Sequence, residues 1–189
     1  IDSTDNLNNY YQLNVRFETA DAMGANFINS CLEQLAKTLQ NEATVYSHFS
    51  KTEKQIEVVM SILSNYVPGS RVKAWVSCPI SDLDDDGDIL AQKFVQAVNI
   101  ANQNPYRAVT HNKGVMNGID ALAIATGNDF RAIEAGIHAY AARNGKYSGL
   151  SKAWIKDKTF WFELEVPLSV GTVGGLTKLH PMVRWSHEL

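Results

Sequence analysis

Near the middle of the chain, residues 110–118 read Thr110-His111-Asn112-Lys113-Gly114-Val115-Met116-Asn117-Gly118. A second short motif follows at residues 125–129, which read Ala125-Thr126-Gly127-Asn128-Asp129. The amide before Lys113 and the glycine after it predict a helix start whose backbone a ligand can approach closely. A lysine ammonium held beside an aspartate would suit the stabilisation of negative charge on a reacting carbonyl. The alternative interpretation is an ordinary solvated lysine.

Regular secondary structure is predicted on both sides of this stretch. Alternating apolar and polar residues predict strands at 11–18, 71–78, 152–156 and 159–166. Apolar residues at helical spacing predict a helix with Asp21 as its N-cap, and a second that runs from a capping-box pattern at 50–53 to Pro68. Further helices are predicted at about 89–102, 115–125 and 130–143. Together these elements predict an α+β fold.

Length and composition limit the possible classes of protein. The 189 residues can hold one domain, or one domain and part of another. A net charge of −3 without a basic stripe argues against nucleic-acid binding, and no apolar run approaches the ~18 residues of a membrane span. The polar start carries no signal-peptide pattern and no initiator Met, so we expect a piece of a longer, cytoplasmic protein. Cys31 and Cys78 are expected to be buried thiols.

The acidic stretch at 82–88 resembles the first half of a calcium-binding loop. Asp82, Asp84, Asp86 and Gly87 match its early positions, but Lys93 occupies the twelfth, where a bidentate glutamate is needed. Because a cation cannot close the metal shell, we expect no metal site and interpret the stretch as a solvated loop that caps the next helix.

Four motifs in sequence order resemble the 3-hydroxy-3-methylglutaryl-coenzyme A (HMG-CoA) reductase family, and its bacterial class in particular. They are Asp21-Ala22-Met23-Gly24-Ala25-Asn26, His111-Asn112-Lys113-Gly114, Thr126-Gly127-Asn128-Asp129 and Gly171-Thr172-Val173-Gly174-Gly175. The likeness covers roughly residues 11–182. The chain departs from the family in a longer segment at 43–75. The family's catalytic glutamate and histidine would lie outside residues 1–189.

The resemblance implies a fold and a reaction. Residues 1–80 would be part of a small, ferredoxin-like, dinucleotide-binding domain, and residues 81–189 part of a large, helix-rich catalytic and substrate domain. The family interconverts HMG-CoA with mevalonate and coenzyme A through two nicotinamide hydride transfers. We therefore expect NAD or NADP as cofactor and a homodimer with its sites at the subunit interface.

The resemblance also assigns site residues. Lys113 would stabilise the oxyanion, and Asp129 would be its hydrogen-bonded partner. Arg107 and Asn117 would bind the acyl substrate. The loop at 171–175 would lie at the active centre, and the cofactor is expected at Asp21, Ala22, Met23, Gly24, Asn26, Gly127 and Asn128.

Two other functions remain open from the residues alone. A non-catalytic module that binds a coenzyme A thioester or a nucleotide would keep the same motifs. A Schiff-base lyase built on Lys113 needs a deprotonated amine, whereas a neighbouring aspartate favours the charged form. As a piece of a reductase, the 189-residue chain is expected to be inactive by itself.

Overall fold

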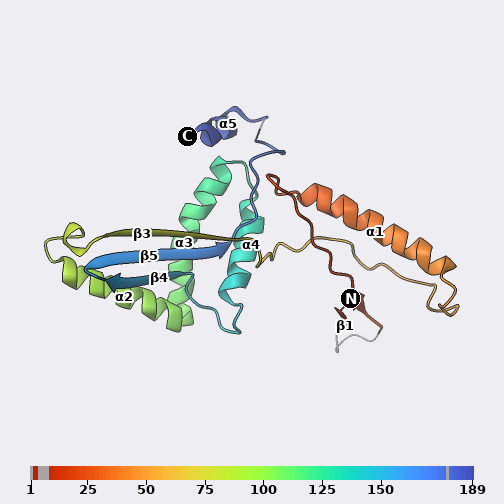
Figure 1. Cartoon of the computed structure of the whole chain (residues 1–189), viewed down its shortest axis with the longest axis horizontal. Coiled ribbons are helices and arrows are strands. Elements are labelled where there is room, and N and C mark those ends of the chain that lie inside the picture. Colours follow the sequence, from red (N-terminus) through yellow and green to blue (C-terminus); the bar gives the residue numbers. More distant parts are fainter. Residues whose placement is uncertain (1, 4–8, 178) are drawn as a thin grey trace. The chain divides into compact units, whose positions relative to one another are not determined.

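A computed structural model describes residues 2–3, 9–177 and 179–189 (Figure 1). The chain divides into two compact units, Ile1–Leu63 and Ser64–Leu189. The division comes earlier than residue 80, because the strand that follows Ser70 pairs with a strand near residue 160. Which unit binds nucleotide and which binds substrate stays a prediction.

The first unit is built on one long helix. β1 (Asp2–Ser3) pairs antiparallel with β2 (Tyr11–Gln12), so the strand predicted at 11–18 is wrong beyond Gln12. α1 (Ala25–Val45) begins after Gly24, whose φ of 77° lies in the left-handed region. Asp21 is therefore not the N-cap. It follows a turn in which the Ala22 amide donates to the Thr19 carbonyl at 3.1 Å.

The helix predicted after the capping box does not form. The box itself is present: the Ser50 amide donates to Glu53 Oε2 at 2.8 Å, and the Glu53 amide donates to Ser50 Oγ at 3.3 Å. The chain then runs extended along α1, tied by Gln40 Nε2 to the Ile56 carbonyl and by the Leu63 amide to Asn29 Oδ1, both at 3.0 Å (Figure 1). A run rich in Val and Ile favours extended backbone, and these contacts fix it.

The second unit contains an antiparallel sheet in the order β3-β5-β4. Its strands are β3 (Arg71–Pro79), β4 (Ser151–Lys156) and β5 (Thr159–Pro167), which confirms the three strands predicted there. Asp157 and Lys158 join β4 to β5 with φ values of 51° and 56°, the backbone of a two-residue hairpin turn. Trp154 stacks on Trp161 across the hairpin.

Helices cover β4 and β5 of this sheet, whereas β3 is exposed. α2 (Gly87–Gln103) packs against β4 with Ala91 and Val98, and α4 (Phe130–Ala141) packs against β5 with Ile137 and Tyr140 (Figure 1). A short 3-10 helix, η1 (Ile80–Asp82), precedes α2. These helices confirm the predictions at 89–102 and 130–143 and the α+β class, whereas the ferredoxin-like organisation stays a prediction.

The helix α3 (Pro105–Ala125) starts ten residues earlier than the one predicted at 115–125. Asn104 Oδ1 accepts from the amides of Tyr106 at 2.9 Å and Arg107 at 3.3 Å, and Pro105 occupies the first turn. Lys113 therefore lies in the middle of a helix rather than at its start. The last helix, α5 (Pro181–Glu188), has no counterpart among the predicted elements. Within the described residues, none of the helices has the length and apolarity to cross a membrane.

Candidate functional site

The residues just before Lys113 fasten α3 to the chain around β4. The side chain of Asn112 is fully buried. Its Nδ2 donates to the Ser148 carbonyl at 2.9 Å, and its Oδ1 accepts from the Leu150 amide at 3.1 Å. The His111 ring lies 2.6 Å from Ser151 Oγ. Since successive helical residues point about 100° apart, these inward contacts leave Lys113 on the exposed side.

His111 is held close to Arg107, one turn earlier on α3. Burial lowers the pKa of His111, and the positive charge of Arg107 lowers it further. The ring therefore stays neutral at physiological pH. A neutral ring can still make the hydrogen bond with Ser151 Oγ. Arg107 itself is exposed and available to a carboxylate.

Lys113 and Asn117 share the exposed surface of α3. They are four residues apart and both exposed, as one helical turn predicts. A Cβ added to Gly114 or Gly118 would meet nothing within 4 Å, so this surface is open to a ligand or a partner. No ion pair reaches Lys113 from any of residues 2–3, 9–177 or 179–189.

A tight turn joins α3 to α4. The Gly127 amide donates to the Ile124 carbonyl at 3.1 Å and the Asn128 amide to the Ala123 carbonyl at 2.8 Å, the paired bonds of a glycine-terminated helix. Gly127 has a φ of 70°, and a Cβ there would lie 2.9 Å from Val183 Cγ1 of α5. The turn therefore needs glycine for both its backbone angle and its packing.

Asp129 is the N-cap of α4. Its Oδ1 accepts from the amides of Arg131 at 3.1 Å and Ala132 at 3.3 Å, and it pairs with Arg131 Nε at 3.3 Å. Partial burial raises the pKa of Asp129, but the hydrogen bonds from Arg131 and Ala132 and the Arg131 charge outweigh it, so the net pKa is lowered. Asp129 is thus held as a carboxylate.

Lys113 and Asp129 are far apart within one chain. The helix from Lys113 to its last residue, Ala125, is about 18 Å long, and Asp129 lies beyond that end. A lysine side chain is shorter than this separation. The helix start predicted at Lys113 is wrong, because Lys113 lies within α3 and only Asp129 lies at a helix start. Their catalytic pairing stays a prediction.

The structure does bring two other motifs together. Asn128 Oδ1 accepts from the Gly171 amide at 2.8 Å, and Asn128 Nδ2 donates to the Gly171 carbonyl at 3.2 Å. The loop at 171–175 is therefore joined to the turn that carries Asp129. His187 of α5 lies 3.0 Å from the Thr126 carbonyl on the same turn.

The expected nucleotide motif of the first unit lies at the start of α1. Gly24 has a φ of 77°, and a Cβ there would lie 2.5 Å from Thr19 Cγ2. No side chain among the described residues caps this helix, and its first turn has no acidic residue. The free amides after Gly24, which include that of Asn26, therefore suit a phosphate. Asp21 is exposed, and Ala22 and Met23 are half-buried beside it.

Sequence reasoning missed one further polar residue, Asp120, on the inner side of α3. Its Oδ1 is buried without a hydrogen-bond partner among the described residues. Burial raises its pKa, and the negative charge of Glu134 on α4 adds to the rise, while His138 opposes it. The sequence signal for this buried carboxyl group was an aspartate between two apolar residues, Ile119 and Ala121, in a helix that packs on another helix.

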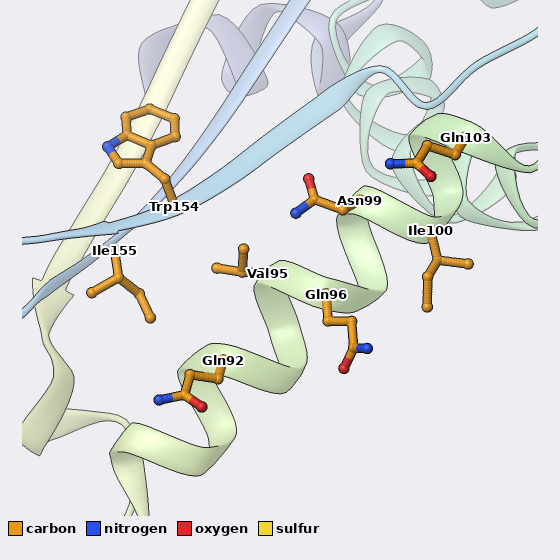
Figure 2. Close-up of a pocket in the computed structure, with 8 residues that line it drawn as sticks. All are labelled: Gln92, Val95, Gln96, Asn99, Ile100, Gln103, Trp154 and Ile155. Carbon is orange, nitrogen blue, oxygen red and sulfur yellow. The ribbon is translucent and has the colours of Figure 1, made fainter.

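A groove of about 460 Å³ lies elsewhere in the second unit, between α2 and the outer edge of β4 (Figure 2). Four carboxamides at helical spacing, Gln92, Gln96, Asn99 and Gln103, line it from α2, and Trp154 flanks it from β4. None of the predicted site residues lines this groove, so it is separate from the motifs above.

Known proteins resemble the chain over most of its length. A 3-hydroxy-3-methylglutaryl-coenzyme A reductase from Archaeoglobus fulgidus is 37% identical over 174 residues, which are 91% of this chain and 36% of the relative. A probable enzyme of that name from Borreliella burgdorferi is 39% identical over 168 residues, 87% of this chain and 36% of the relative. The chain thus spans little more than a third of these curated relatives.

A solved structure agrees with them. The class II 3-hydroxy-3-methylglutaryl-CoA reductase of Streptococcus pneumoniae, bound to NADPH, has a TM-score of 0.78 and 42% identity over 90% of this chain and 45% of that one. The family model for hydroxymethylglutaryl-coenzyme A reductase matches residues 1–189. The chain therefore belongs to the hydroxymethylglutaryl-coenzyme A reductase family.

Proposed function

We propose that the complete protein that carries this chain interconverts HMG-CoA with mevalonate and coenzyme A, using two nicotinamide hydride transfers. Family membership over the whole chain is the observation that carries the proposal. The relative from Streptococcus pneumoniae is described with NADPH bound, which supports NADPH or NADH as the hydride donor. The chain contributes about a third of such a protein, so activity belongs to the complete polypeptide.

The start of α1 fits a nicotinamide dinucleotide. The free amides of the first turn and the lack of an acidic residue there suit the pyrophosphate. Asp21, Ala22, Met23 and Asn26 would border it. When bound, the nicotinamide supplies the hydride for each reduction step.

In this proposal, Lys113 stabilises the charge that develops on the substrate. Its exposed ammonium, which no described carboxylate neutralises within the chain, would contact the thioester oxygen. A preorganised donor of this kind lowers the barrier by about 3–4 kcal/mol. Asn117 on the same surface would hold the acyl group. Arg107 would bind the free carboxylate of the substrate through its guanidinium fork.

We further infer that Lys113 and Asp129 meet between two copies of the chain. The separation of about 18 Å along α3 supports this, because neither side chain can span it. The side of α3 that carries Lys113 also has large exposed apolar residues, among them Tyr106 at 88% and Ile124 at 58% exposure. Apolar residues exposed in this way along one helix mark a contact surface. A homodimer would cover them and complete two equivalent sites.

Mixing two inactive variants tests this arrangement. Lys113→Ala removes the ammonium, and Asp129→Asn removes the carboxylate while keeping a residue that caps α4 well. In the complete protein each variant alone should lose reductase activity. After subunit exchange, half the dimers are mixed and each mixed dimer has one intact site, so about a quarter of wild-type activity should return.

The outcomes separate the parts of the proposal. Verified mixed dimers without recovered activity would contradict the shared site. If the wild-type protein binds HMG-CoA or NADPH but turns neither over, the reductase function fails and a non-catalytic binding module takes its place.

A further inference from the structure

The carboxamide of Asn128 is fully engaged inside the protein. Its Oδ1 accepts from the Gly171 amide at 2.8 Å. Its two Nδ2 hydrogens are used by the Gly171 carbonyl at 3.2 Å and by Thr126 Oγ1 at 3.1 Å. An amide nitrogen has two hydrogens to donate, so Asn128 keeps no donor for a ligand.

These bonds connect two segments that are distant in sequence. On one side, the backbone between Thr126 and Asp129 is fixed by the glycine end of α3 and by the N-cap of α4. On the other side, Gly171 is buried and begins a loop in which Gly174 and Gly175 have φ values of 85° and 53°. The side chain of Asn128 pairs with Gly171 as a neighbouring strand would, through both backbone groups of one residue.

We propose that Asn128 is a positioning residue that holds the loop at 171–175 against the turn carrying Asp129, so that the two form one rigid wall of the site. This inference rests on the proposed reductase function, and it differs from a direct contact between Asn128 and the nucleotide. Asn128 adjoins Asp129 in sequence. The same hydrogen bonds that anchor the loop therefore also fix the backbone position from which the Asp129 side chain extends.

The chemistry at this position favours a carboxamide. An aspartate could accept from the Gly171 amide, but its second oxygen would face the Gly171 carbonyl and add a negative charge beside Asp129. An alanine would leave both backbone groups of Gly171 without this partner, and unpaired buried groups are costly. A glutamine keeps the donor and the acceptor on a longer arm, so it should restore part of the contact.

The test compares Asn128→Ala with Asn144→Ala in the complete protein. Asn144 is exposed after the end of α4, and no hydrogen bond involves its side chain among the described residues. Asn128→Ala should speed hydrogen exchange of the Gly171 amide roughly tenfold or more, because the amide loses its acceptor. It should lower kcat by roughly ten- to a hundredfold through misplacement, with the Kd for NADPH changed less than about twofold.

Two further results decide the proposal. Asn128→Gln should recover part of the kcat and part of the Gly171 protection, and it supplies the same readouts if the alanine variant does not fold. The proposal is overturned if Gly171 exchange stays unchanged, or if the Kd for NADPH rises as much as kcat falls, which would make Asn128 a nucleotide contact. A wild-type protein without turnover would contradict the proposed reductase function. Hydrogen exchange of the Gly171 amide would still show whether Asn128 holds the loop at 171–175.

Discussion

Replacing Asn112 by alanine should destabilise the second unit severely without touching the proposed chemistry. Asn112 neighbours Lys113 in the sequence, yet its side chain is 0% exposed and bonded only to the backbone. Nδ2 donates to the Ser148 carbonyl at 2.9 Å, and Oδ1 accepts from the Leu150 amide at 3.1 Å. These two bonds attach α3 to the segment that leads into β4.

The size of the effect follows from what the substitution leaves behind. The Ser148 carbonyl and the Leu150 amide would both lose their partner, and each unsatisfied buried group costs about 1–3 kcal/mol. The small cavity left by the amide adds to this loss. We therefore expect the free energy of unfolding to fall by about 3 kcal/mol, which lowers the melting temperature by roughly 10 °C for a unit of this size.

Urea unfolding, followed by the fluorescence of Trp154 and Trp161 on the sheet of the same unit, measures the change. Asn117→Ala is the matched control, because Asn117 is the same residue type on the same helix but exposed. It should change stability by less than about 0.5 kcal/mol while weakening substrate binding. A loss below about 1 kcal/mol for Asn112→Ala, or equal losses for both variants, would refute the assignment of Asn112 to structure and Asn117 to the site.

Two further substitutions probe the interior. Asp120→Asn should raise the urea midpoint at pH 7: the raised pKa of Asp120, caused by burial and by Glu134, means that its ionisation costs stability as pH rises above about 4. The benefit should vanish near pH 3, and a pH-independent benefit would contradict this cause. Gly127→Ala should cost more than Gly145→Ala, since both need a positive φ but only Gly127 packs on Val183. Equal losses of about 1 kcal/mol in the free energy of unfolding would show that the Val183 side chain moves aside without a further loss of stability.

Much of the second unit could be predicted because its signals are local. Alternation predicts the extents of β3 and β5, and Asp157-Lys158 is a two-residue hairpin loop whose backbone pairs the flanking strands. Residues at helical spacing in α2 and α4, such as Val98 and Ile137, are buried. In these two helices the residues that define the element are among those that pack, whereas β3 is held by its hydrogen bonds to β5 and stays exposed.

The failures share a tertiary cause. The capping box at 50–53 forms its two hydrogen bonds, but the chain beyond it gains more by bonding to Gln40 and Asn29 along α1 than by continuing as a helix. α3 starts earlier than predicted because Asn104 caps it and Pro105 occupies its first turn, although an Asn-Pro pair is also a signal that ends a helix. The same two residues end one helix and start the next. The sequence alone does not show whether a loop separates the two helices.

The residue types of the candidate site come from the resemblance, whereas its geometry comes from the fold. The resemblance implies Lys113 and Asp129, which are 16 positions apart in the sequence. The sequence predicts a helix from 115 and a helix start near Lys113, whereas the helix begins at Pro105 and places Lys113 in its middle. Tertiary contacts from Asn112 and His111 hold this helix in place.

The rigidity of α3 has a consequence for the proposed dimer. If Lys113 of one copy faces Asp129 of the other, and the reverse holds by two-fold symmetry, the two helices must run antiparallel past each other. Their symmetry axis then passes near the midpoint of these residues, close to Ala121. Gly118 and Ala121 are exposed there, and such small residues allow two helix backbones to approach closely. Gly118 and Ala121 would then be the residues that let the partner helix dock, and the distance that separates Lys113 from Asp129 within one chain would set the spacing of the two sites.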